Sequence, residues 1–418
     1  MVKVILVNSK EEDVRIAVLE DGVAAEIYLD HKQSQRLVGN IYKGRVENVL
    51  PGMQAAFVDV GLEKNAFLYI EDALPARHIE GKSGSRDYSG IYIRDVLKRD
   101  QEILVQVAKE HTGAKGPRVT THITLPGRYA VLMPMTDYVG VSRRITGEKE
   151  RERLKELATR VKPEDMGVIV RTVAEGVEGD EFRRDIDIIG ELWQNTLRRS
   201  AQFPAPYLAH RDLDLVRRTI RDIFAGDVDR MLVDSRHEYE KILELLDVVG
   251  PHLKQRVYLE EGKDLFAYYG VEHEIERALR RKARLKSGGY LIIDQTEALT
   301  VIDVNTGKYV GTTNLEDTAL KTNLEAAKEV VRHLRLRNIS GIIIIDFIDM
   351  QNEENRLAVL NLLEEETKKD RTKTSIFGLT RLGLVEMTRK KTWPSLSEVL
   401  QKPCSYCGGR GKEPRTGA

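Results

Sequence analysis

Two runs decide the fold of this chain: YLIIDQTEALTVIDVN at residues 290–305 and GIIIIDFID at residues 341–349. The first run has two apolar segments on either side of a polar turn, and we expect two strands there. Residues 315–337 carry apolar side chains at i, i+3 and i+4 spacing, which predicts a helix with Asn314 as its N-cap. The second run is apolar at nearly every position, so we expect a strand covered on both faces. Strand, helix and buried strand predict a β-α-β crossover.

Two aspartates stand at the carboxyl ends of the strands that this crossover brings side by side. Asp303 and Asp346 should converge, and Asn305 shares the face of Asp303 because side chains alternate along a strand. Neighbouring carboxylates repel one another unless a cation neutralises them, and Mg²⁺ is often held by one or two carboxylates. The alternative is that both aspartates are ordinary strand-ending turn residues. His333, the only histidine of this region, lies far from the strand ends. A nuclease that relies on a pair of histidines for acid-base chemistry would therefore be hard to place here, whereas a metal ion that polarises phosphate and activates water needs none.

Upstream of the crossover, short apolar strands alternate with glycine turns. They lie at residues 41–46, 55–61, 66–70 and 103–107. Several short strands at this spacing predict a small β-barrel. Phe57 and Phe67 fall on these strands, and the residues alone favour a place for them in the barrel core.

The segment between barrel and crossover mixes strand and helix. It has an apolar strand at residues 167–170 and a helix from about residue 180 to 199. FPAP at residues 203–206 then breaks the chain, because proline cannot continue a helix. Helical stretches lead on to ERALRRKARLK at residues 276–286, which has six basic side chains. This basic run is either a nucleic-acid-binding patch or a solvated helix face.

Composition limits the classes of protein to which the chain can belong. Its 418 residues suffice for about two to four domains. No apolar stretch approaches the ~18 residues of a membrane-spanning helix, so no membrane partner is expected. The 2 cysteines cannot build a disulfide framework, which predicts a reducing, cytoplasmic location. The balance of 66 Lys+Arg against 66 Asp+Glu argues against a nucleic-acid partner on average, but local basic patches remain compatible with one.

Both cysteines belong to one motif, Cys404-Ser-Tyr-Cys407, in glycine-rich sequence. Tetrahedral zinc needs four ligands, and the motif offers only two sulfurs. Either two chains share one zinc ion, or the pair is a redox dithiol, or both thiols are free. The glycine-rich surroundings are typical of zinc-binding turns, which favours the shared zinc ion.

Six segments of the chain resemble those of the bacterial ribonuclease E/G family. They are GNIYKG at 39–44, QAAFVD at 54–59, NLEAA at 323–327, RLR at 335–337, IDFIDM at 345–350 and CSYC at 404–407. The resemblance runs essentially from end to end and is closer to the ribonuclease G branch. It implies a Mg²⁺-dependent endoribonuclease that cleaves single-stranded RNA to 5′-phosphate and 3′-hydroxyl ends. It also implies a preference for 5′-monophosphorylated RNA and roles in rRNA maturation and mRNA decay.

The resemblance further implies roles for individual residues. The catalytic set would be Asp303 and Asp346 as ligands of Mg²⁺, with Asn305 in support. The RNA-binding set would be Phe57, Phe67 and Lys115. The pocket for the RNA's 5′-monophosphate would be Arg171, Thr172, Gly127 and Val131. A structural Zn²⁺ joining two copies into a homodimer would be held by Cys404 and Cys407.

The fold implied by the resemblance is an α+β multi-domain chain. Its expected parts are an RNase H-like subdomain at 1–38 and 207–280, an OB-fold RNA-binding barrel of the ribosomal S-one type at 39–120, a 5′-phosphate sensor subdomain at 121–206, a DNase I-like catalytic subdomain at 281–400 and a zinc link at 401–418.

The sequence departs from the family pattern at two points. Ser405 stands where the family usually has proline, a change that leaves both thiolates in place. The sequence ends at Ala418, shortly after the cysteine motif, so we expect dimers rather than tetramers and no degradosome scaffold tail. Two rival hypotheses are a non-catalytic RNA-binding protein that uses the barrel and the basic helix, and a zinc-linked scaffold that binds no RNA.

Overall fold

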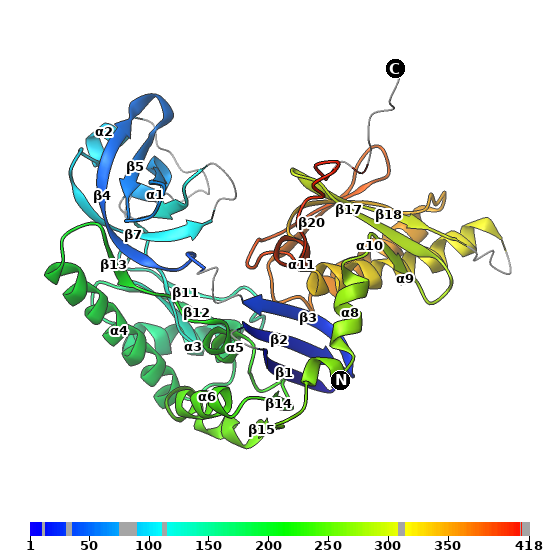
Figure 1. Ribbon diagram of the computed structural model, residues 1–418, viewed down its shortest axis with the longest axis horizontal. Coiled ribbons are helices and arrows are strands. Elements are labelled where there is room, and N and C mark those ends of the chain that lie inside the picture. Colours follow the sequence, from blue (N-terminus) through cyan, green and yellow to red (C-terminus); the bar gives the residue numbers. More distant parts are fainter. Residues whose placement is uncertain are drawn as a thin grey trace. The chain divides into compact units, whose positions relative to one another are not determined.

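The structure is a computed structural model that describes residues 1–10, 13–30, 36–74, 90–110, 115–307, 314–409 and 411. The chain divides into two compact units. Unit 1 combines Met1–Lys32 with Gly226–Ala418, and unit 2 is Gln33–Ala225. The described residues form four β-sheets with helices packed on them, so the fold is mixed α+β, as predicted (Figure 1). None of the described helices is long and apolar enough to cross a membrane.

Unit 2 begins with a closed, OB-like β-barrel. Its described strands run in the order β4-β5-β6-β8-β7, and pairing of β4 with β7 closes the barrel. The strands are β4 (Ile41–Leu50), β5 (Ala55–Asp59), β6 (Ala66–Tyr69), β7 (Glu102–Lys109) and β8 (Arg118–Thr120), with α1 (Ile70–Ala73) and α2 (Ile93–Val96) beside them. Val46, Val58 and Leu68 belong to its core. The barrel prediction is confirmed, but the sequence pattern does not reveal β8, because three residues are too few to show a period.

A second sheet of unit 2 has the order β11-β12-β10-β9. Its elements are β9 (Leu125–Pro126), β10 (Ala130–Met133), β11 (Val139–Val141) and β12 (Gly167–Val170), with helices α3 (Glu148–Val161), α4 (Gly179–Gln202) and α5 (Leu215–Asp222). Helix α4 buries Phe182, Ile186 and Trp193 in the core beneath this sheet. The FPAP segment follows α4 inside unit 2, and β13 (Tyr207–His210) then pairs with β4 of the barrel. The predicted strand and helix of this segment are confirmed.

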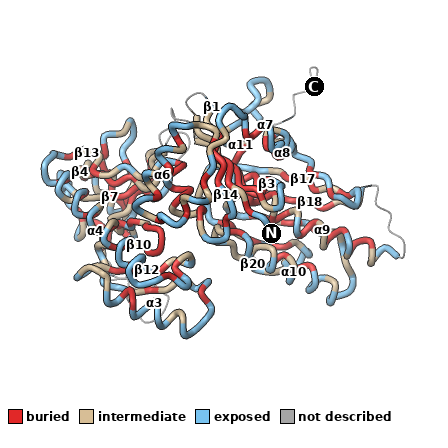
Figure 2. Tube along the Cα trace, turned by 90° about the horizontal axis from the view of Figure 1, so that it is seen from below, coloured by how far each residue is buried: buried red, intermediate tan, exposed pale blue. Residues whose placement is uncertain are grey.

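The first sheet of unit 1 joins the beginning of the chain to residues from its second half. Its order is β15-β14-β1-β2-β3, with β1 parallel to β14. The elements are β1 (Lys3–Lys10), β2 (Asp13–Glu20), β3 (Val23–Asp30), β14 (Arg230–Val233) and β15 (Val257–Leu259), with helices α6 (Arg236–Val249), α7 (Leu265–Tyr268) and α8 (Val271–Ala278). The middle strands are largely buried (Figure 2). Asp21 and Gly22 both have positive φ, as a two-residue hairpin turn requires.

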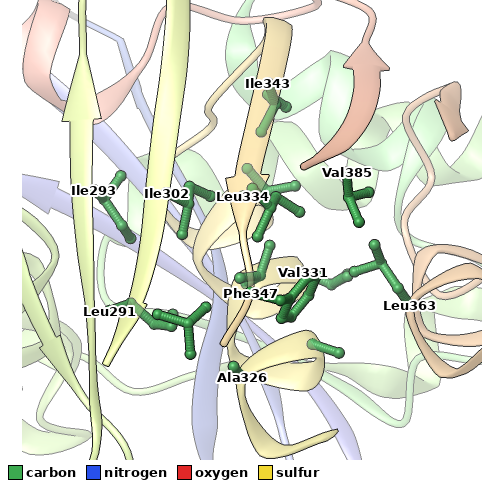
Figure 3. Close-up of a cluster of buried hydrophobic side chains, with 14 of the residues drawn as sticks. Leu291, Ile293, Ile302, Ala326, Val331, Leu334, Ile343, Phe347, Leu363 and Val385 are labelled. Atoms are coloured by element: carbon green, nitrogen blue, oxygen red, sulfur yellow. The ribbon is translucent and has the colours of Figure 1, made fainter. Parts of the chain in front are cut away.

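The second sheet of unit 1 contains the predicted crossover. Its order is β16-β17-β18-β19-β21-β20, and β18 and β19 are parallel neighbours. The elements are β16 (Lys282–Arg284), β17 (Tyr290–Gln295), β18 (Leu299–Asn305), α9 (Leu315–Leu336), β19 (Gly341–Asp346), α10 (Glu353–Thr367), β20 (Thr374–Leu379), β21 (Val385–Arg389) and α11 (Leu396–Leu400). Val331 and Leu334 of α9 pack with Ile302 and Ile343 of the sheet (Figure 3). The Asn314 side chain accepts a hydrogen bond from the backbone N of Asp317 at 2.7 Å, so the predicted N-cap is confirmed.

Two expectations for unit 1 are wrong. Strand β19 is not covered on both faces: Ile343 and Ile345 are fully buried, whereas Ile342 is 50% exposed. One face of the sheet packs on α9, and the other face, which we call the open face, remains accessible. The basic run is not a continuous helix, because α8 ends at Ala278 and residues 282–284 form strand β16.

Candidate active site and RNA-binding residues

The crossover brings Asp303 and Asp346 together on the open face. Asp303 of β18 lies directly beside Asp346 of β19 in the parallel register, and neighbouring strands are about 4.8 Å apart. The Nδ2 group of Asn305 donates a hydrogen bond of 2.8 Å to Oδ2 of Asp303. Burial, with the nearby carboxylates of Asp303 and Asp349, raises the pKa of Asp346. These groups therefore repel one another in the absence of a cation.

This donor set matches the requirements of Mg²⁺. The ion typically takes one or two protein carboxylates and completes its octahedral shell with water and substrate phosphate oxygens. Within the described ranges, no three His, Cys, Asp or Glu side chains gather into a ligand group, so the pair with Asn305 is the arrangement to consider. Asp346 is exposed and Asp303 is partly exposed, so water and phosphate ligands have access to the pair.

The barrel carries a row of half-exposed aromatic side chains. Phe57 lies opposite Phe67 on neighbouring strands, with ring centroids 5.5 Å apart, and Phe67 contacts Tyr69 at 4.5 Å. The guanidinium of Arg118 stacks over the Tyr69 ring at 4.6 Å. Phe57 and Phe67 lie outside the barrel core, so the core placement favoured by the residues alone is wrong. Tyr69, which is 39% exposed, extends the row and was not predicted from sequence.

Lys115 lies close to this aromatic row along the backbone. The next residue, Gly116, packs so tightly against the Asn65 carbonyl that a Cβ there would come within 1.9 Å of the oxygen. The Pro117 carbonyl accepts a hydrogen bond from the backbone N of Phe67 at 2.8 Å. The exposed Lys115 is thus held beside the strand that carries Phe67.

Arg171 and Thr172 lie where β12 ends, near the turn at Gly127. Arg171 Nη1 donates to the Gly127 carbonyl at 2.5 Å, and Arg171 Nη2 donates to Oδ1 of Asp222 at 2.6 Å. Thr172 Oγ1 is 2.9 Å from Ser142 Oγ. Val131 of β10 lies opposite Ile169, two positions before Arg171. The structure therefore gathers all four residues of the expected 5′-phosphate pocket around one strand end.

Two acidic residues that sequence reasoning missed hold this group of residues in place. The Asp185 carboxylate accepts hydrogen bonds from the backbone N of Arg128, Tyr129 and Ala130, at 2.9, 2.8 and 3.1 Å, and so fixes the turn after Gly127. Burial alone would raise the pKa of Asp222, but hydrogen bonds and charge from Arg221 and Arg171 outweigh it and lower that pKa. Neither residue has a sequence signal, because the Asp185–Arg128 and Asp222–Arg171 contacts span 57 and 51 positions.

The cysteine motif forms a compact turn. Cys404 is exposed and Cys407 is partly buried. Backbone N–H groups of Cys407 and Tyr406 donate to the Cys404 sulfur and lower its pKa. The backbone N of Gly411 donates to Cys407 Sγ at 3.2 Å. The N–H···S bonds to Cys404 favour its thiolate, the form that binds metals.

Comparison with known proteins identifies the family to which the chain belongs. The model of the Ribonuclease E/G family matches residues 124–392. The chain belongs to the ribonuclease E/G family. It is 46% identical to the protein named Ribonuclease G of Escherichia coli (strain K12) over 408 residues, which is 97% of this chain and 83% of that protein.

Other members of the ribonuclease E/G family are similarly close. Ribonuclease G of Haemophilus influenzae is 44% identical over 98% of this chain and 83% of its own length. Ribonuclease E of Nostoc sp. is 41% identical over 90% of this chain and 54% of its own length. The range matched by the ribonuclease E/G family model includes the positions of Arg171, Asp303 and Asp346.

Proposed function

We propose that this protein, an endoribonuclease of the ribonuclease E/G family, hydrolyses single-stranded RNA with Mg²⁺ held between Asp303 and Asp346. One observation carries the proposal: two carboxylates are adjacent in register on an accessible sheet face, and neither forms a salt bridge with a described residue. Such a pair is costly unless a cation occupies it. The family name of the relatives supplies the reaction class.

The residues of the site have distinct tasks in this reaction. When bound, Mg²⁺ would polarise the scissile phosphate and lower the pKa of a water molecule. Asp303 and Asp346 hold the positive charge at the strand ends, and Asn305 fixes the Asp303 carboxylate. A water oxygen forms the new bond to phosphorus, the bond to the 3′ oxygen breaks, and that oxygen takes up a proton. The products are 5′-phosphate and 3′-hydroxyl ends.

RNA binding is assigned to the barrel. The half-exposed rings of Phe57 and Phe67, with Tyr69, can stack on bases, at about 1–3 kcal/mol per base regardless of sequence. Lys115 adds a cation beside them. This arrangement suits an enzyme that accepts many single strands.

Three further parts of the proposal follow the family expectation. The Arg171 pocket, with Thr172, Gly127 and Val131, would bind the 5′-monophosphate of RNA through charge-assisted hydrogen bonds. The cysteine turn would share one Zn²⁺ with a second copy of the chain in a homodimer. The subdomain names and boundaries predicted from sequence, the cytoplasmic location and the roles in rRNA maturation and mRNA decay remain predictions.

A cleavage assay tests the catalytic proposal. The substrate is a 5′-labelled single-stranded oligoribonucleotide, with and without Mg²⁺, and the readout is the rate at which new 5′-phosphate ends appear. We expect Asp303→Asn and Asp346→Asn to lower the rate by at least about a hundredfold, because each removes one of the two charges that hold the ion. Asp247→Asn, which removes a carboxylate of α6 that is paired with Lys254, is the matched control and should cleave normally.

Two outcomes would contradict the proposal. Wild-type rates in both aspartate variants would remove Asp303 and Asp346 from the reaction. Tight RNA binding without any Mg²⁺-dependent 5′-phosphate ends would instead support the rival, non-catalytic RNA-binding protein.

A further inference from the structure

Strand β16 places two basic side chains on the open face. In the antiparallel register, Lys282 lies opposite Ile292 and Arg284 lies opposite Tyr290. On the next strand pair, Ile292 lies opposite Asp303, and Tyr290 lies opposite Asn305. Residues that are directly opposite one another point to the same face of a sheet. Lys282 therefore shares a cross-strand row with Asp303, and Arg284 shares one with Asn305.

The basic side chains of this run differ in how they are neutralised. Arg277 forms a salt bridge with Glu274 at 2.7 Å, and Arg281 forms a bidentate pair with Asp294. Lys282 and Arg284 are exposed, and among the described residues neither has a carboxylate partner. Lys282 instead places its Nζ 3.4 Å from the centre of the Tyr290 ring. Both cations of strand β16 are thus left available for an external anion.

Distance prevents the catalytic carboxylates from neutralising these two cations directly. Two strand spacings separate β16 from β18, which is about 10 Å. An anionic chain that crosses β18, β17 and β16 in turn would meet the Asp303–Asp346 pair first and the cations next. RNA has this chemistry, because its phosphates recur along the strand on both sides of the scissile bond. The Tyr290 ring, held under Lys282, lies between the two positions.

We propose that Lys282 and Arg284 bind backbone phosphates of RNA next to the scissile phosphate. The guanidinium of Arg284 can hold a phosphate through two parallel hydrogen bonds, and Lys282 acts as a point charge. The inference rests on the proposed function, since it takes the Asp303–Asp346 pair as the position of the scissile phosphate. The proposal accounts for the basic side chains at the two exposed positions of strand β16. The alternative of a solvated helix face does not, because these residues form a strand.

Salt dependence of RNA binding tests the inference without cleavage. Affinity for a 5′-hydroxyl single-stranded oligoribonucleotide is measured by fluorescence anisotropy between low and high KCl, without added Mg²⁺. Each phosphate contact on a single strand contributes about 0.7 to the slope of log affinity against log salt. We expect K282Q/R284Q to reduce the slope by about 1.4 and to weaken binding roughly tenfold at moderate salt. The charge-exchanged variant K282R/R284K should keep the slope of the wild type.

The control has the same change of charge. K241Q/R277Q removes two basic residues of unit 1 that are paired with Glu238 and Glu274, and we expect an unchanged slope. An equal slope in K282Q/R284Q and K241Q/R277Q would overturn the inference. If K282Q/R284Q does not fold, the single variants K282Q and R284Q test the inference instead. Each is expected to reduce the slope of log affinity against log salt by about 0.7. The proposed function is tested separately, because the salt dependence of RNA affinity is measured without catalysis. Cleavage by Asp303→Asn at the wild-type rate would refute the proposed function but would not change the result of the binding experiment.

Discussion

At the scale of the residue, the proposed 5′-phosphate pocket shows how one guanidinium is held in place by its neighbours. Arg171 is held by the Gly127 carbonyl and by Asp222, so its position is fixed in the free protein. Preorganised donors lose little freedom on binding. Sequence reasoning located Arg171 and Thr172 through resemblance alone. It could not locate Asp222 or Asp185, because carboxylates that act through tertiary contacts have no local pattern.

We expect Arg171→Ala to reduce the cleavage rate of 5′-monophosphorylated RNA about tenfold. The cleavage rate of 5′-hydroxyl RNA should change little. A charge-assisted hydrogen bond contributes about 1.5–3 kcal/mol, and the hydroxyl end has no phosphate to receive it. The measurement compares kcat/KM for one oligonucleotide with either end. Arg183→Ala, which removes an exposed arginine from α4, is the control. Equal losses on both substrates would exclude Arg171 from sensing the 5′ end.

Gly127 is predicted to be intolerant of any side chain. A Cβ there would lie 2.2 Å from Ile189 Cδ1 and 2.6 Å from Asp185 Oδ2, and these neighbours belong to the packed helix α4. Gly127→Ala should lower the free energy of unfolding by about 1–3 kcal/mol, as overpacking does, and weaken the preference for 5′-monophosphorylated RNA. Gly190→Ala on the same helix, whose Cβ would meet nothing within 4 Å, should be neutral or stabilising. Denaturant unfolding of the two variants checks this difference.

At the scale of the element, helix α9 has a buried histidine among arginines. His333 Nδ1 accepts a hydrogen bond from Arg337 Nε at 3.2 Å, and Arg332 Nη2 lies 3.4 Å from His333 Nε2. Burial, followed by the charges of Arg337 and Arg332, lowers the pKa of His333 well below its usual value of 6.5. The imidazole is therefore neutral in the folded protein near neutral pH.

The unfolding free energy should depend on pH through His333. In the unfolded chain the imidazole takes up a proton below about pH 6.5, whereas the folded state resists it. The contribution of His333 to the free energy of unfolding is thus fully present above pH 6.5. It is lost as the pH falls below that value, at up to about 1.4 kcal/mol per pH unit. His333→Gln should flatten this dependence between pH 6.5 and 5. An unchanged pH dependence, equal to that of the exposed control His273→Gln, would show that His333 does not contribute.

Elements with a clear period or an unbroken apolar run could be predicted from sequence. The helix capped by Asn314 matches the structure closely because its period and its cap agree, and the apolar strand at residues 167–170 matches as well. Strand β16 was missed because six basic residues in eleven resemble a helix surface, while the register with β17 is a tertiary property. The open face of β19 was missed because four consecutive isoleucines do not reveal which face is covered.

At the scale of the whole molecule, the cysteine turn predicts an assembly. One motif supplies two sulfurs, so a tetrahedral zinc ion requires a second chain. Metal analysis should find about one zinc per two chains, and Cys404→Ser with Cys407→Ser should convert dimers to monomers in light scattering. Ser405→Ala, between the two cysteines, is the control. One full zinc ion per chain, or dimers that persist without zinc, would contradict a shared site.

The pairing of β1 with β14 has a consequence for synthesis on the ribosome. The first three strands leave the ribosome roughly 200 residues before the strand that β1 needs as its parallel neighbour. At about 5–20 residues per second, this delay is ~10–40 s. All of unit 2 is translated within that interval, so it can fold while the early hairpin strands still have an unpaired edge. Vectorial synthesis thus favours completion of the inserted unit before the unit that surrounds it in sequence.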